Sequence, residues 1–409
     1  MADFRTTDRL LTLEEALVQI QDALSKQDSY ERLPLKKALH RVVYQDIIST
    51  VDVPGFRNSS MDGYALRFSD LAQSSLNVIA TSWAGKPYTG FVGQGECVRI
   101  FTGAYVPADC DCVVMQENIS QCEDTINVKH WPKHEENIRN MGDDTKRGQT
   151  LFAKGKALGP ADIGLLASCG IADIAVFKSL TVGFFSTGDE LASIGSALKL
   201  GQIYDSNRYT LHALLEETGV TAIDMGVIPD NAKAVEVALH SASKQCDVII
   251  TTGGVSVGGA DFITNVLDKI GNVNLWKIAI KPGKPLLFGC INNTHFFGLP
   301  GNPVSVMVTF QQVVSPALKK LMGHSTTQAG LILQATTTET ITKHPGRVEF
   351  QRGFAENIDG KIIVKPTGRQ GSHILSSMSK ANCFIVLEQN SGDIKKGQTV
   401  SIQLLGNSL

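Results

Sequence analysis

The stretch from residue 247 to residue 310 constrains the fold of this chain more than any other part. An apolar, strand-forming run at 248–250 leads into a loop that carries Gly253, Gly254, Gly258 and Gly259. Glycines there let the backbone approach a ligand and turn its N–H groups inward, and a following helix start favours an anion. The pattern therefore predicts a strand, a phosphate-binding loop and a helix that Asp261 opens.

Positive charge follows in the same stretch. Lys277, Lys281 and Lys284 come after the predicted helix, and a Pro-Gly-Asn-Pro turn at 300–303 precedes another apolar helix. Cations and a second helix start can converge on the glycine loop. We interpret the whole stretch as one anion-handling site for a phosphate-bearing ligand.

The stretch lies within a longer α/β pattern. The predicted elements are strands at 180–185, 221–228 and 247–254 and helices at about 207–218, 231–243, 261–270 and 303–321. Such alternation predicts a mostly parallel sheet with helices on both faces, and ligands bind beyond the carboxyl ends of its strands. Glu190, Asp230 and Asp261 follow such ends, although each alone could be a helix cap or a surface charge.

The flanking segments carry different patterns. Thr12 and Glu15 have the spacing of a capping box before a helical apolar stripe, and a helix is expected from Pro160 to Gly170. Short strands at about 76–130 predict a small antiparallel or mixed β domain. The last 80 or so residues consist of short strands, which are typical of a compact β-barrel or sandwich.

Composition sets the class of protein. Hydrophobic content of 43% and charged content of 19% are typical of a soluble globular chain, and 409 residues suffice for several domains. The net charge of −2 gives no overall footprint for nucleic acid or an anionic membrane. The polar start lacks the form of a secretory signal, so a cytoplasmic location is expected. Eight cysteines without a CxxC pair argue against a disulfide framework or zinc site.

Seven strings carry a resemblance to a known family. NSSMDGYA, STGDEL, GQIYDSN, TTGGVSVGGAD, KPGKP, GLPGNPVS and GRQGSH occur in this order and over nearly the whole chain. In this respect the sequence resembles the molybdopterin molybdenumtransferase family, which comprises the bacterial MoeA enzymes and the related C-terminal part of gephyrin. Seven ordered motifs are far more specific than one glycine loop.

The resemblance implies a multi-domain fold of α/β and β parts. The expected domains are a discontinuous N-terminal helical and extended domain for linkage and dimerisation (1–50 with 142–178), a small β domain (51–141), a central α/β molybdopterin-binding domain (179–327) and a C-terminal β-barrel-like domain (328–409). It also implies an elongated homodimer, whose active cleft lies between one subunit's glycine-loop domain and its partner's small β domain.

The implied reaction is the last step of molybdenum cofactor synthesis. Family members use adenylylated molybdopterin and molybdate, cleave the adenylyl diphosphate bond with a divalent cation, usually Mg²⁺, and release AMP. An upstream adenylyltransferase is a possible partner, whereas nucleic acid and membrane are not expected. Hard oxygen ligands suit magnesium, and lysine, arginine, hydroxyl and N–H donors suit the tetrahedral molybdate dianion.

The family's site positions transfer onto this chain by motif. The acidic, catalytic positions are Asp62, Asp144, Glu190, Asp230 and Asp261, of which Glu190, Asp230 and Asp261 are the expected metal ligands. The substrate-binding positions are Thr102, Ser186, Thr187, Gly188, Thr252, Gly253, Gly254, Ser256, Gly258, Lys277, Pro300, Gly301, Asn302 and Pro303. The molybdate-binding positions are Lys281, Lys284, Pro285, Ser305, Arg352 and Ser372.

The sequence leaves some alternatives open. Asp143 and Asp144 are adjacent, and we favour Asp144 for the family position. Gly259 stands where relatives often carry an acidic side chain, which loosens the loop but leaves Asp261 in place. Two other functions are a molybdopterin adenylyltransferase, whose single small domain does not account for the residues before 180 and after 330, and a non-catalytic gephyrin-like scaffold.

Overall fold

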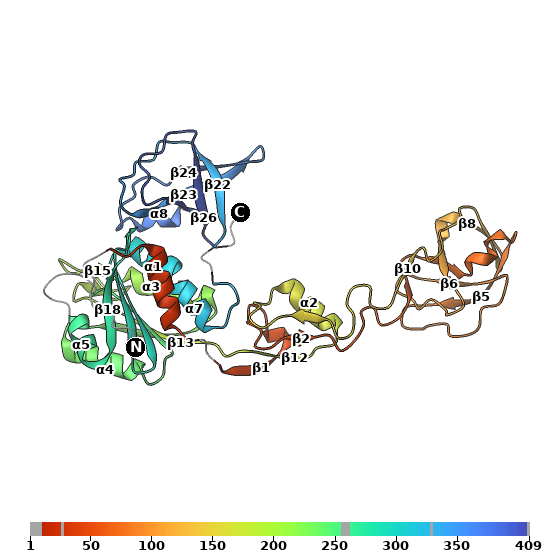
Figure 1. Cartoon of the computed structure of the whole chain (residues 1–409), viewed down its shortest axis with the longest axis horizontal. Helices are drawn as coiled ribbons and strands as arrows, with labels where there is room; N and C mark the ends of the chain where they lie inside the picture. Colours follow the sequence, from red (N-terminus) through yellow and green to blue (C-terminus); the bar gives the residue numbers. More distant parts are fainter. Residues whose placement is uncertain (1–9, 26–27, 255–261, 328–329, 407–409) are drawn as a thin grey trace. The chain divides into compact units, whose positions relative to one another are not determined.

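The computed structural model describes residues 10–25, 28–254, 262–327 and 330–406, and it separates into two compact units (Figure 1). Unit 1 comprises residues 1–31, 40–42 and 177–409, and unit 2 comprises residues 32–39 and 43–176. All eight cysteines are free thiols. The finer division into four domains stays a prediction.

A six-stranded mixed sheet forms the centre of unit 1. Its strands, in spatial order, are β16 (Thr221–Ile228), β13 (Thr181–Thr187), β17 (Val248–Thr252), β21 (Thr294–Leu299), β20 (Pro285–Ile291) and β18 (Asn272–Lys277). The first four are parallel, whereas β20 runs antiparallel to β21 and β18. The expected mostly parallel sheet is therefore confirmed, with an antiparallel edge.

Helices cover both faces of this sheet (Figure 1). Successive strand residues point to opposite faces, so Phe184 enters one buried core and Phe185 the other. The first core includes α1 (Leu13–Ala23), α3 (Ser206–Thr218), α6 (Pro303–Thr309) and α7 (Ser315–Leu321), and the second includes α4 (Ala232–Ala242) and α5 (Phe262–Ile270). A π-helical turn, Phe310–Val314, joins α6 to α7.

The capping box at Thr12 and Glu15 is present in the structure, and it starts α1. Ala16 and Ile20 on this helix are fully buried in the same core as the α/β sheet, so the structure places α1 in unit 1. Its predicted apolar stripe is thus a packing face.

A small closed barrel forms the C-terminal part of unit 1. Its strands are β22 (Ile332–Thr337), β23 (Val348–Ile358), β24 (Lys361–Pro366), β25 (Cys383–Leu387) and β26 (Thr399–Leu404). Pairing of β23 with β25 closes the sheet, which confirms the barrel alternative over an open sandwich. Short β19 (Ile280–Lys281) pairs with β23, and Phe350 and Phe384 belong to the core of the α/β sheet. One continuous core therefore joins barrel and sheet, and α8 (Leu375–Ser379) lies between barrel strands in the chain.

Unit 2 contains a second six-stranded mixed sheet. Its strands, in spatial order, are β7 (Cys112–Met115), β4 (Gly63–Leu66), β6 (Glu96–Ile100), β5 (Leu76–Ser82), β9 (Thr125–Val128) and β8 (Ile119–Cys122). Only β5 and β6 pair in parallel among these neighbours, as expected for a small mixed β domain.

Shorter elements complete unit 2. They are β1 (Tyr30–Pro34), β2 (Ile47–Ile48), β3 (Asn58–Ser59), β10 (Ile138–Arg139), β11 (Thr150–Phe152), α2 (Pro160–Ser168) and β12 (Asp173–Phe177), with β1 and β12 reaching the unit's boundary. Helix α2 begins at Pro160, where the sequence predicted it. Leu35, Val43, Leu166 and Val176 are among the residues of a separate small core.

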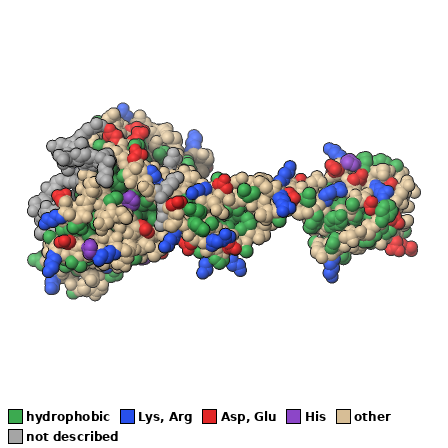
Figure 2. All heavy atoms as spheres, turned by 60° about the horizontal axis from the view of Figure 1, so that its bottom comes forward, with side chains coloured by type: hydrophobic (Ala, Val, Ile, Leu, Met, Phe, Trp, Pro, Cys, Tyr) green, Lys and Arg blue, Asp and Glu red, His purple; other side chains and the backbone are tan. Residues whose placement is uncertain are grey.

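The surface carries charge of both signs. On the face shown in Figure 2, Lys and Arg side chains are interspersed with Asp and Glu side chains. This distribution agrees with the net charge of −2. Among the described residues, helices of the length and apolar character needed to cross a membrane do not occur.

Candidate functional site

Four strand ends meet at one edge of the unit 1 sheet. Parallel pairing sets Thr187 beside Ile228, Ser186 beside Thr252, and Thr252 beside Leu299. Because the strands are parallel, the loops that follow them emerge at the same edge. Residues 188–190, 229–230, 253–254 and 300–302 are therefore brought together, as the sequence predicted.

The last residues of two of these strands, β13 and β17, carry hydroxyl groups. Ser186 and Thr252 are almost fully buried, and their hydroxyl oxygens lie 2.9 Å apart. Thr187 Oγ1 is buried without a hydrogen-bond partner among the described residues. A Cβ built on Gly254 would lie 3.1 Å from that oxygen, so the Thr187 hydroxyl is next to the start of the glycine loop. A buried donor of this kind is costly unless a ligand or water satisfies it.

Two residues of the GQIYDSN string brace this edge. Asp205 caps α3 by accepting from Arg208 N at 3.1 Å, and it also accepts from Ser186 Oγ at 3.2 Å. Asn207 Nδ2 donates to the carbonyl of Gly301 at 2.7 Å. The start of α3 is thereby tied to the ends of β13 and β21. Helix α6 begins at Pro303, and Asn302 occupies its N-cap position. Pro300 precedes this cap by two residues.

Three carboxylates form what we call the acidic edge: Asp189, Glu190 and Asp230. Glu190 is exposed, and a Cβ on Gly188 would lie 2.6 Å from its Oε2, so the absence of a side chain at 188 makes room for it. Asp230 N donates to Asp189 Oδ1 at 3.3 Å. Partial burial and repulsion by Asp189 and Glu190 raise the pKa of Asp230.

The donor set of the acidic edge fits a hard divalent cation. A carboxylate whose pKa is raised by neighbouring carboxylates, as at Asp230, is stabilised in its ionised form by a nearby cation. Carboxylate oxygen is also a preferred ligand of Mg²⁺. Among described residues, three such side chains do not come close enough to enclose a metal ion by themselves. The predicted positions Ser256, Gly258 and Asp261, together with Gly259, lie outside the described residues.

The basic cluster, defined as Lys281, Lys284, Ser305, Arg352 and Ser372, lies where the sheet meets the barrel. Three contacts bring its segments together: a Cβ on Gly283 would lie 3.7 Å from the Ser305 carbonyl, Val304 N donates to Ser372 O at 3.1 Å, and Arg352 Nη2 donates to Gly371 O at 3.0 Å. Gly283 has φ +110° and would place a Cβ 2.5 Å from Thr309 Oγ1, so only glycine fits this turn.

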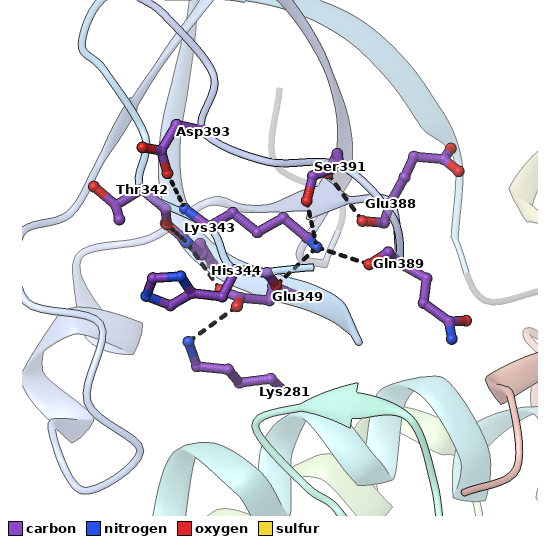
Figure 3. A network of polar contacts seen from close by, with 10 residues as sticks. Lys281, Thr342, Lys343, His344, Glu349, Glu388, Gln389, Ser391 and Asp393 are labelled. Atoms are coloured by element: carbon purple, nitrogen blue, oxygen red, sulfur yellow. Dashed lines mark hydrogen bonds and ion pairs between the residues drawn. The ribbon is translucent and has the colours of Figure 1, made fainter. Parts of the chain in front are cut away.

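The lysines of the stretch differ in their surroundings. Lys284 is exposed, and its carbonyl accepts from Ile278 N. Lys281 Nζ donates to the buried carboxylate of Glu349 at 2.9 Å (Figure 3). Lys277 ends β18 opposite Pro285, which begins β20. Lys281 and Lys284 thus belong to one turn, whereas Lys277 lies on the adjoining strand.

Arg352 is 1% exposed, and its guanidinium is hydrogen-bonded to the segment of the barrel between β24 and β25. It donates to Ser377 Oγ at 2.9 Å and to the carbonyls of Arg369 and Gly371 at 3.3 and 3.0 Å. Burial lowers the pKa of Arg352 to about 10, which leaves it charged at neutral pH. In this arrangement Arg352 holds the GRQGSH loop that carries Ser372.

Three of the predicted site residues, Asp62, Thr102 and Asp144, lie in unit 2. Asp62 Oδ1 accepts from both N and Oγ1 of Thr102 at 2.8 Å, and these bonds, with nearby Arg99, lower the pKa of Asp62. Asp143 accepts from Asn140 N at 2.6 Å and so belongs to a turn, whereas the Asp144 side chain is exposed. An ionised carboxylate beside a hydroxyl is thus available at Asp62.

Sequence reasoning missed several residues that the structure adds. Asp189 lies in the STGDEL string beside Glu190, and Asp205 and Asn207 lie in the GQIYDSN string, so their motif membership was the available indication. Glu349 lies outside every quoted string. Only the pairing of β19 with β23, which makes Lys281 and Glu349 register partners, reveals its connection to the site.

Three family profiles match the chain in succession. The MoeA N-terminal region (domain I and II) matches residues 11–170, the probable molybdopterin binding domain matches 183–320, and the MoeA C-terminal region (domain IV) matches 334–405. Together these ranges span well over half of the chain.

Relatives and solved structures give the same result. A molybdopterin molybdenumtransferase of Haemophilus influenzae is 47% identical over 397 residues, which cover 96% of this chain and 98% of the relative. One from Bacillus subtilis is 32% identical over 391 residues, covering 93% and 91%. A crystal structure of a molybdopterin biosynthesis moeA protein from Pyrococcus horikoshii has a TM-score of 0.85 at 30% identity, covering 97% of this chain and 100% of that one.

Proposed function

Because this chain belongs to the MoeA family of molybdopterin molybdenumtransferases, we propose that it transfers molybdenum from molybdate to adenylylated molybdopterin and releases AMP. Its role in molybdenum cofactor biosynthesis follows from the family. The adenylylated substrate, the Mg²⁺ dependence and the AMP product are the proposal.

The convergence of strand ends in unit 1 is the observation that carries this proposal. The buried Thr187 hydroxyl, which has no hydrogen-bond partner within the described part of the chain, lies beside Gly254 at the edge that also carries Glu190 and Asp230. Hydroxyl and backbone N–H donors suit phosphate oxygens, and the adjacent carboxylates suit a cation that accompanies them. This chemistry supports binding of a diphosphate together with a divalent metal ion.

The acidic edge would hold the cation, with Glu190 and Asp230 as ligands and Asp189 beside them. A bound magnesium ion would supply neutralisation of charge on the diphosphate oxygens. The chain's own residues orient the substrate: Thr187 and the glycine loop bind the phosphates, and Asp205 fixes Ser186 and Thr252 behind them. Asp261, outside the described residues, is a further proposed ligand.

The basic cluster would receive molybdate. Lys281 and Lys284 provide ammonium donors on one turn, and Ser305 and Ser372 lie on segments that contact each other through Val304 N. Ammonium and hydroxyl donors suit an oxyanion with two negative charges. Separate anion sites at the strand ends and at the barrel would keep diphosphate and molybdate apart before transfer.

We also infer a homodimer and delivery of substrate by an upstream adenylyltransferase. Light scattering tests the first of these, because an active monomer would contradict it. Neither inference is needed for the chemistry that the unit 1 residues support.

The decisive experiment incubates purified protein with adenylylated molybdopterin, molybdate and Mg²⁺. We expect AMP release together with formation of the molybdenum cofactor, and we expect chelation of the metal to stop it. If AMP is not released under these conditions, the proposed reaction is wrong. Consumption of ATP with unadenylylated molybdopterin would instead identify an adenylyltransferase, and inactivity in both assays would favour a scaffold.

A further inference from the structure

Lys281 has a buried carboxylate as its structural partner. Lys281 in β19 and Glu349 in β23 are register partners on parallel strands, and Lys281 Nζ donates to Glu349 Oε1 at 2.9 Å. The Lys281 side chain is 44% exposed, whereas that of Glu349 is 4% exposed. The ammonium thus lies at the surface while its partner lies inside the protein.

The second oxygen of Glu349 is also held in place. Gln351 Nε2 donates to Glu349 Oε2 at 3.1 Å and to the carbonyl of Thr342 at 3.0 Å. Both carboxylate oxygens therefore have hydrogen-bond partners, and the carboxylate has little freedom to rotate. A fixed acceptor restricts the ammonium that donates to it.

Lys343 places a second positive charge near this carboxylate (Figure 3). It is 2% exposed, and its ammonium donates to the carbonyls of His344, Gln389 and Ser391 at 3.3, 3.1 and 3.0 Å. Burial lowers the pKa of Lys343, and the Glu349 carboxylate opposes that shift. The Glu349 carboxylate thus stabilises the charged form of Lys343 inside the barrel.

The charges of these three residues do not cancel. Counted in their charged forms, one carboxylate and two ammonium groups leave one net positive charge, and Lys281 is the exposed member of the three. An ammonium has three N–H donors, and among described contacts the Lys281 ammonium uses one, on Glu349. Two donors and the uncancelled charge remain available to an anion.

We propose that Glu349 is a positioning residue for the molybdate site: it fixes the Lys281 ammonium at the exposed side of the basic cluster, and Lys343 is the buried counterion that lets it do so without cancelling the charge of Lys281. This inference rests on the proposed function, because it takes molybdate as the anion that Lys281 receives. It assigns a role to two residues on the barrel that act through Lys281 rather than as ligands of that anion.

Glu349→Gln tests the proposal because position and net charge predict opposite results. A count of charges alone predicts tighter anion binding when a carboxylate is removed. If Glu349 positions Lys281, loss of this charge-assisted hydrogen bond should weaken molybdate binding about tenfold. Isothermal titration of the full-length protein with sodium molybdate, without pterin, measures this directly, and Glu356→Gln on the exposed part of β23 is the matched control.

A double-mutant cycle separates positioning from a general structural effect. Lys281→Met should weaken molybdate binding, and Glu349→Gln should add little in the Lys281→Met background, because Glu349 acts through Lys281. Fully additive effects would overturn the proposal, as would tighter or unchanged binding by Glu349→Gln alone.

Two further measurements keep the test decisive. If Glu349→Gln does not fold, Glu349→Asp retains the charge near Lys343 but withdraws the oxygen from Lys281, and an affinity equal to that of the wild type would contradict positioning. If the wild-type protein itself does not bind molybdate, the proposed molybdate site is wrong and the inference falls with it. Wild-type binding that Glu349 substitutions leave unchanged overturns the role of Glu349 alone.

Discussion

The acidic edge and the basic cluster of unit 1 handle charge in opposite ways. At the acidic edge, three side chains of like charge lie close together, and Asp189 and Glu190 raise the pKa of Asp230. In the basic cluster, by contrast, Arg352 donates to three oxygens of the protein and Lys281 is paired with Glu349. We propose that a cation from outside completes the first arrangement, whereas the second is already held by the fold.

This difference predicts different responses to mutation. Removing a carboxylate from the acidic edge should affect the reaction and leave the fold intact, because repulsion is lost with it. Removing a buried cation from the basic cluster should affect both, because the hydrogen bonds that it donates to the protein are lost. The following experiments test this contrast in order of expected size.

Arg352→Met should have the largest effect. It removes the hydrogen bonds donated to Ser377 Oγ and to the carbonyls of Arg369 and Gly371, so we expect the free energy of unfolding to fall by about 3 kcal/mol. Urea denaturation measures this loss, and Arg369→Met on the exposed side chain of the same loop is the control. A stable Arg352→Met variant that has lost only molybdate binding would show that the guanidinium serves the ligand rather than the loop.

Asp230→Asn should slow AMP release strongly and leave stability almost unchanged. Loss of one preorganised charged group at a reacting centre costs about 100-fold in rate. The unfolding midpoint should stay the same or rise slightly, because repulsion with Asp189 and Glu190 is removed. AMP release at saturating Mg²⁺ and urea denaturation are compared with Asp268→Asn on the exposed face of α5. Near-normal AMP release would remove Asp230 from the proposed metal ligands.

Lys284→Ala should weaken molybdate binding without changing stability or pterin binding. The side chain is exposed, so its removal leaves the core unchanged, while loss of one charge-assisted bond costs about 1.5–3 kcal/mol, or roughly tenfold to hundredfold in affinity. The molybdate concentration for half-maximal cofactor formation should rise by that factor, and binding of adenylylated pterin without molybdate should not change. Lys365→Ala on β24 is the control. Lost pterin binding with normal molybdate dependence would mean that the two anions were assigned to the wrong regions.

The smallest effect concerns the pH dependence of stability. The pKa of Asp230 is raised in the folded protein above its usual value of 3.8, so the folded state retains this proton at a pH where the unfolded state has lost it. Its contribution to stability is therefore present at low pH and decreases as the pH rises through the raised pKa. With chelator present, the free energy of unfolding of the wild type should fall by up to about 1 kcal/mol relative to Asp230→Asn as the pH rises through the raised pKa. The effect is small because solvent screens most of the charge on the Asp230 carboxylate.

Mg²⁺ should remove much of that pH-dependent loss at neutral pH, because bound cation stabilises the ionised carboxylates. Urea midpoints measured from pH 4 to pH 7, with and without Mg²⁺, check the sign. A loss that grows toward low pH instead would mean that Asp230 is paired favourably in the folded state.

Local patterns in the sequence were enough for the secondary structure and for the order of motifs. The Thr12 capping box, the start of α2 at Pro160 and the alternation of strands and helices after residue 180 each depend on residues a few positions apart. The same alternation predicted that Glu190 and Asp230 follow strand ends. Parallel strands then bring those ends to one edge, so part of the site could be inferred without coordinates.

Partnerships over long sequence distances could not be inferred in this way. Lys281 and Glu349 are 68 positions apart, and the Asn207 amide reaches Gly301 over 94 positions. The motif pattern assigned Arg352 to molybdate, but it could not predict that the guanidinium would be buried and hydrogen-bonded to the loop that follows β24.

The sequence by itself therefore determined which elements form, in what order, and which family the chain resembles, because these depend on short-range periodicity, caps and motif spacing. The tertiary structure alone decided which charges are satisfied. Strand pairing of β19 with β23 buries Glu349 between Lys281 and Lys343, and the shared edge of β13 and β16 sets Asp230 against Asp189. Charge interactions depend on separation and burial, and both are properties of the packed chain rather than of its order of residues.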